Sequence, residues 1–184
     1  MLSDSAARAL LVLHTLVGMA AVAVTTHLVI WLRRYVRGAA GRRPVVRFAV
    51  IGCALQGIAL LAGTAMYPSY RVEVRLAYLE NSREVARELE ARAKVAPLSQ
   101  LEAPATAAMV ERAAHAVRWF EIKEHWVAIG CVCAAAVLLV LAFWRPDRDG
   151  TVIAPFVVGL AVISAASTWL AAIIGVLTAA WRAV

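Results

Sequence analysis

The sequence predicts an all-α integral membrane protein: a four-helix bundle with an external helical hairpin between its second and third helices. Of its 184 residues, 62% are apolar and 17% are charged, whereas a soluble domain has about 45–50% and about 25%. The apolar residues gather into four long runs, and about 20 helical residues cross a bilayer core. These observations exclude an ordinary soluble enzyme. The length allows one membrane domain, 1–184.

The first run is too long for the apolar part of a cleavable signal, which has about 7–15 residues. Because Asp4 also precedes it, we expect a retained helix. Pro155, near the start of the fourth run, predicts that the first turn there is kinked or lies outside the core. The four expected spans cover about residues 9–32, 48–67, 126–144 and 152–180.

The first connection, residues 33–47, holds six arginines and no acid. Lys and Arg beside short loops mark the cytoplasmic side, so this basic loop is expected there and both the N- and C-termini outside. The long segment 68–125 carries nine basic and nine acidic residues. The net charge of +7 therefore comes mostly from the inner loop, which indicates contact with an anionic leaflet and not with nucleic acid.

The external helical segment 68–125 is expected to form the hairpin. Apolar residues recur at three- and four-residue steps over 71–94, which predicts a helix. Pro97 and Pro104 break it, and a second helix restarts near Ala105 and runs into the third span. This hairpin is expected to cover the bundle or a partner subunit. The Ala-, Arg- and Val-rich composition favours a bacterial cytoplasmic (inner) membrane.

Common catalytic motifs are missing from the sequence, so it does not decide whether the chain is an enzyme. There is no Walker loop, dinucleotide fingerprint, GxSxG or HExxH. Cys53, Cys131 and Cys133 lie inside expected spans. Their positions indicate small packing residues rather than a disulfide framework or a metal clip.

Polar side chains inside a membrane are costly and are therefore candidate functional groups. His14 lies in the first span on one helical face with Gly18, Ala21 and Thr25, small residues typical of a packed interior. We expect this face to point into the bundle. His27 lies elsewhere on the same helix and is expected to bond to a backbone carbonyl.

His125 begins the third span, and the face it shares with Ile129, Val132 and Leu139 is expected to point inward too. On the second helix, Gln56 and Tyr67 share a face with two glycines. The spacing therefore aims polar groups from three helices at one place near the outer end.

Three hypotheses follow for this place. The first is a single haem b with His14 and His125 as axial ligands, Gly18 giving the ring clearance and Arg71 near the propionates. In this first hypothesis, Tyr67 and Gln56 hydrogen-bond a quinone or the edge of the haem macrocycle. The second is a cofactor-free accessory or scaffold subunit whose histidines join helices. The third is a metal site of His14, Glu121 and His125.

The span count, with His14 and His125 on the first and third helices, resembles four-helix b-type membrane cytochromes. Such families often carry four ligand histidines in two layers, which this chain lacks. The resemblance implies an electron-transfer subunit that holds haem b near the outer face, in exchange with quinone. Its partners would be the lipid bilayer, other membrane subunits or an extracytoplasmic redox protein.

Overall fold

A computed structural model describes residues 4–69, 83, 87, 90 and 106–181. In these residues the chain is helical apart from short connections and contains no strand, which confirms the all-α prediction. The expected helix over 71–94 lies outside the described residues except at positions 83, 87 and 90. The elements are α1 (Asp4–Val36), α2 (Arg42–Ser69), α4 (Thr106–Phe143), α5 (Pro146–Asp149) and α6 (Ala154–Trp181).

Four of these helices are long and apolar enough to cross a membrane, which confirms the predicted number of spans. Large apolar side chains cover their outer surface; Phe143, for example, is 80% exposed. A soluble monomer rarely exposes so much apolar surface, so the chain is a multi-pass membrane protein. The spanning segments are Arg8–Val36, Arg42–Tyr67, Arg118–Phe143 and Ala154–Leu177.

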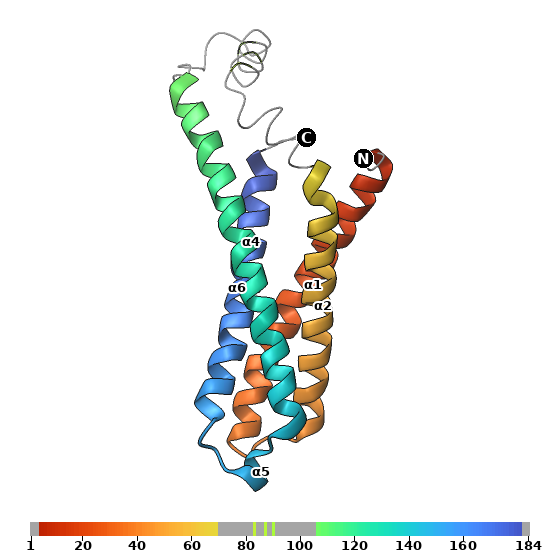
Figure 1. Cartoon of the computed structure of the whole chain (residues 1–184), viewed down its shortest axis with the longest axis vertical. Helices are drawn as coiled ribbons and strands as arrows, with labels where there is room; N and C mark the ends of the chain where they lie inside the picture. Colours follow the sequence, from red (N-terminus) through yellow and green to blue (C-terminus); the bar gives the residue numbers. More distant parts are fainter. Residues whose placement is uncertain (1–3, 70–82, 84–86, 88–89, 91–105, 182–184) are drawn as a thin grey trace.

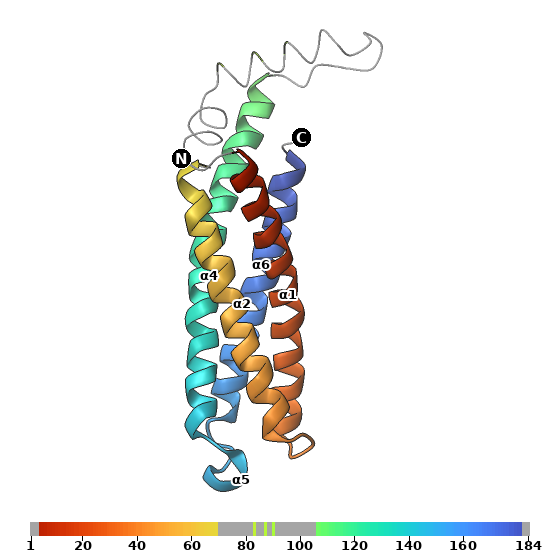
Figure 2. The same cartoon turned by 90° about the vertical axis from the view of Figure 1, so that its right-hand side faces the viewer.

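The four long helices form a ring in which α1 packs on α2, α2 on α4, α4 on α6 and α6 on α1. Both termini lie at one end of this bundle, here called the terminal end (Figure 1). The α1–α2 connection and α5 lie at the other, here called the loop end. The α1–α2 and α4–α6 pairs diverge towards the terminal end, and Figure 2 shows the same bundle from the side.

The closest apolar packing lies at the loop end. Leu32, Val45, Val137 and Leu141 are fully buried there and come from three different helices. The Trp144 indole N–H donates to the carbonyl of Gly150 at 3.1 Å, which ties the end of α4 to the turn after α5. The loop end therefore holds the apolar core of the bundle.

Glycine and proline set the helix boundaries at the loop end. The Ala39 N–H donates to the Arg34 carbonyl, and Gly38 between them has φ +74°, a left-handed conformation that ends α1. Pro155 lies in the first turn of α6, where a missing backbone N–H costs little. α4 begins at Thr106 and continues through the third span, which confirms the restart expected near Ala105.

Candidate functional site

A layer of polar side chains crosses the middle of the bundle. The Gln56 amide on α2 donates to the Ser164 hydroxyl on α6 at 2.7 Å. The hydroxyls of Thr25 on α1 and Thr168 on α6 bond at 3.0 Å, and the Ser167 hydroxyl donates to the backbone carbonyl of Trp126 on α4. Side chains or backbone from all four spans therefore meet in this polar layer.

Close packing in this layer depends on a glycine of α4. A methyl group at Gly130 would collide with the Ser167 side chain and come within 3.7 Å of the Gln56 carbonyl oxygen. That Gln56 oxygen is buried and has no hydrogen-bond partner within the described part of the chain. The inward direction expected for Gln56 is confirmed, since the side chain is 3% exposed.

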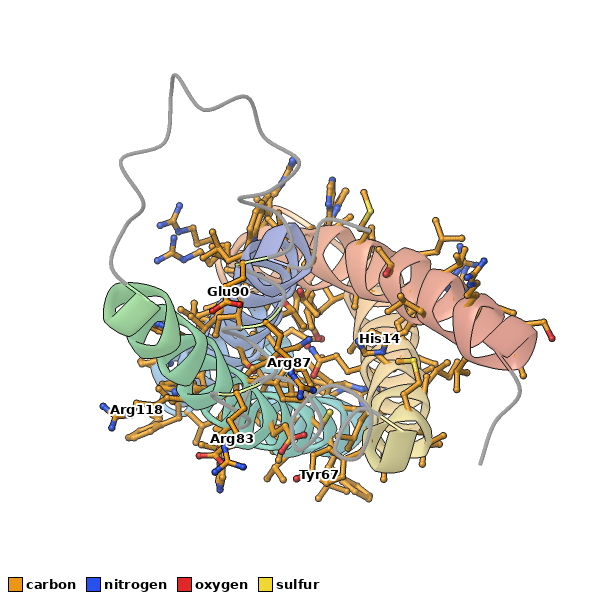
Figure 3. The ribbon with its side chains drawn as sticks, turned by 90° about the horizontal axis from the view of Figure 1, so that it is seen from above. His14, Tyr67, Arg83, Arg87, Glu90 and Arg118 are labelled. Atoms are coloured by element: carbon orange, nitrogen blue, oxygen red, sulfur yellow. The ribbon has the colours of Figure 1, made fainter. Side chains whose placement is uncertain are left out.

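His14 lies on the terminal-end side of the polar layer, half-buried against α2. Its Nδ1 is 3.0 Å from the Ala59 carbonyl oxygen, and its ring comes within 3.4 Å of the position that a Cβ on Gly63 would take. A carbonyl only accepts, so in the neutral ring Nδ1 carries the proton and Nε2 keeps a lone pair. Figure 3 shows His14 between α1 and α2, on the side that faces the centre of the four helices.

The inward face predicted for α1 is confirmed. Ala21 and Thr25, which share the His14 face, are each 1% exposed. A Cβ placed on Gly18, one turn after His14, would meet no atom within 4 Å. The space at Gly18 is therefore open.

Lys123 on α4 carries a cationic side chain that reaches towards α6. Its Nζ lies 3.6 Å from the position of a Cβ on Gly175 of α6 and 5.3 Å above the Phe120 ring. The seven-residue spacing of Lys123 from buried Gly130 puts it on the inward face of α4.

His125 does not join His14. Its side chain is exposed, and its Nδ1 lies 2.8 Å from the Glu121 carbonyl oxygen of its own helix. Five residues separate it from buried Gly130, which turns it by about 140° from the inward direction.

The inward face predicted for the third span is wrong. Ile129, Val132 and Leu139, which share the His125 face, are 48%, 70% and 63% exposed. The inward side is a different stripe of mostly small or branched residues. Its members are Gly130, Ala134, Val137 and Leu141.

The remaining candidates lie apart from His14. Tyr67 is half-buried at the end of its span and lies at the edge of the ring in Figure 3. Arg71 lies outside the described residues. Glu121 is exposed, and the described residues contain no group of three His, Cys, Asp or Glu side chains able to hold a metal ion.

His27 behaves as the sequence predicted. Its Nδ1 bonds the Ala23 carbonyl of its own helix at 2.8 Å, and its exposed ring stacks on Phe48 of α2. The three cysteines are free thiols, with Cys133 buried and the other two half-buried. The predicted absence of a disulfide framework is therefore consistent with the structure.

The α6 hydroxyls are the part of the polar layer that was not predicted from the sequence. Ser164 and Thr168 both bond side chains of other helices. A signal was present, because these hydroxyls recur at three- and four-residue steps on an otherwise apolar helix.

Comparison with protein-family models, curated proteins and solved structures found no match to the chain.

Proposed function

We propose that the chain is an electron-transfer subunit that holds one haem b in the terminal half of the bundle, with His14 as its iron-binding side chain. The observation that supports this most is the hydrogen bond from the His14 Nδ1–H to the Ala59 carbonyl. Such a bond fixes ring and tautomer and leaves Nε2 as the ligand atom, as at many histidine metal sites. The bound haem would supply reversible one-electron chemistry.

Two neighbours of His14 suit an amphipathic ligand with acidic groups. Open space beside Gly18 gives clearance on the His14 face. Lys123 supplies a cation on the inward face of α4. A propionate or another acid would gain a charge-assisted hydrogen bond from such an ammonium. In the quinone version of the proposal, the Lys123 ammonium would donate a hydrogen bond to a quinone carbonyl.

The proposal differs from the sequence hypothesis in its ligand set. His125 faces away from the inward stripe of α4, so the geometry favours one protein ligand over the His14–His125 pair. The test is a dithionite-reduced minus oxidised visible spectrum of the full chain, purified in detergent after expression with haem supplied. We expect a haem difference spectrum and about one haem per chain. A colourless protein would contradict the proposal.

A second candidate function is a cofactor-free accessory or scaffold subunit of a larger membrane complex. The observation that favours it is the polar layer, because Gln56–Ser164 and Thr25–Thr168 join helices without a ligand. In this version the protein is colourless and copurifies with other membrane subunits.

The orientation and membrane belong to the proposal as well. The arginines of the 33–47 connection support a cytoplasmic loop end, with both termini outside. The membrane would be a bacterial cytoplasmic membrane. The haem site would then lie near the extracytoplasmic face, where an external redox partner could exchange electrons with it.

A further inference from the structure

A cleft at the loop end, opposite the haem proposal, gathers cationic and hydroxyl groups. It has a volume of about 470 Å³ and lies where the α1–α2 connection meets the start of α5. The side chains used here come from the end of α1, the start of α2 and the α4–α6 connection. They are Tyr35, Arg42, Arg145, Asp147 and Thr151.

Arg42 is held in place but keeps hydrogen-bonding capacity. Its Nη2 donates to the Leu141 carbonyl oxygen at 2.7 Å and more weakly to the Ala142 carbonyl oxygen at 3.4 Å. Its Nε is buried and has no partner among the described residues. A guanidinium has five N–H donors, and a buried one left unsatisfied costs free energy. Arg42 lines the cleft, so its guanidinium can also meet an acceptor there.

Arg145 provides the second guanidinium of the cleft wall. Its backbone N–H donates to the Asp149 carboxylate at 2.7 Å, which fixes the turn into α5. The carboxylate of Asp147 lines the cleft and would repel an anion. The carboxylate of Asp149 is engaged by the backbone N–H of Arg145. The arginines of the 33–47 connection outweigh these two acids, so the loop end stays cationic.

The depth of the cleft indicates the ligand. Val36 ends one spanning segment and Arg42 begins the next, so the cleft lies at the level of the lipid head groups. Basic pockets between helices at this level bind anionic head groups. The geometry points to a phosphate-binding site at this cleft in which Arg42 and Arg145 bind the phosphate of an anionic phospholipid. The Tyr35 hydroxyl is a third donor.

The experiment measures lipid retained by the full-length protein. Wild-type chain is reconstituted in nanodiscs of mixed phosphatidylglycerol and phosphatidylcholine, and lipids that survive transfer to detergent are counted by native mass spectrometry. Arg145→Gln should lower retained phosphatidylglycerol by about tenfold, because a hydrogen bond to a charged group is lost. The matched control is Arg148→Gln, which removes the same charge from an exposed residue of α5 that does not line the cleft.

Equal losses in Arg145→Gln and Arg148→Gln, or equal retention of phosphatidylcholine, would overturn the site. Tyr35→Phe keeps the buried ring and should also lower retention, which covers the case in which Arg145→Gln does not fold.

A further arm of the experiment adds millimolar inorganic phosphate. If phosphate displaces the lipid from the wild-type protein but not from Arg145→Gln, the same site also binds free phosphate. Lipid retention that phosphate leaves unchanged supports the head group alone.

Discussion

The Gln56 amide and the Ser164 hydroxyl bond across the diagonal of the helix ring. α2 and α6 are not neighbours in that ring, so this bond spans its centre. Most polar contacts in the spans join adjacent helices or turns of one helix. The Gln56–Ser164 bond therefore couples the two helix pairs, which diverge beyond it towards the terminal end (Figure 1).

The two ends of this bond should respond unequally to substitution. Ser164→Ala leaves the buried Gln56 amide unpaired, and we expect a loss of about 1–3 kcal/mol in the free energy of unfolding. Gln56→Met removes both the N–H donors and the unpartnered oxygen of the amide, and the Ser164 hydroxyl can turn to a carbonyl of its own helix, so the loss should be less than about 1 kcal/mol. Unfolding of the purified protein by SDS titration measures both. Equal losses would show that the bond is not the dominant contact of Gln56.

Gly130→Ala should destabilise the bundle by about 1–3 kcal/mol, because the new methyl group collides with Ser167. Gly57→Ala and Gly159→Ala are matched controls on other spans, since a Cβ at either position meets no atom within 4 Å. Both should be neutral or slightly stabilising, as alanine favours a helix over glycine. Adding Ser167→Gly to Gly130→Ala should restore part of the loss; no restoration would place the collision elsewhere.

Lys123→Gln should shift the midpoint potential of the bound haem downward. A nearby cation stabilises the reduced haem, which carries one less positive charge than the oxidised form, so its removal favours oxidation. We expect a shift on the order of 50 mV in a potentiometric titration. Arg118→Gln is the control, because Arg118 is exposed on the same helix and points away from the bundle (Figure 3). Equal shifts would mean that only net charge matters.

The proposed orientation predicts which side of the membrane a new thiol faces. In a background without the three native cysteines, Ala39→Cys should react with a membrane-impermeant maleimide in inverted vesicles only. Ser5→Cys, at the terminal end, should react in right-side-out vesicles only. The opposite pattern would reverse the topology and place the His14 region near the cytoplasm.

Hydropathy predicted the spans well because the bilayer requires about 20 apolar helical residues whatever their packing. Inward faces were predicted correctly where small residues marked them, as Ala21 and Thr25 do on α1. On α4 the prediction followed large apolar residues such as Val132, which face lipid. In a membrane both the lipid and the core are apolar, so hydrophobicity alone does not separate them.

The candidate site was predicted only in part, for the same physical reason. His14 and Gln56 stand out because a polar group in a span must find a partner inside the bundle. Lys123 lies at a span boundary, where lysine is common. Its inward direction could be predicted only with the correct inward face of α4. The loop-end cleft joins Arg42 to Arg145, more than 100 residues later, and no local pattern indicates that contact.

The central claim is that His14 holds the haem, and a comparison of two histidine variants tests it most directly. His14→Ala and His27→Ala remove the same ring from the same helix, and both rings bond a backbone carbonyl through Nδ1. Haem per chain, measured by pyridine haemochrome after matched purification, should fall to near zero in His14→Ala and stay at the wild-type level in His27→Ala. Equal haem content in the two variants would contradict the assignment.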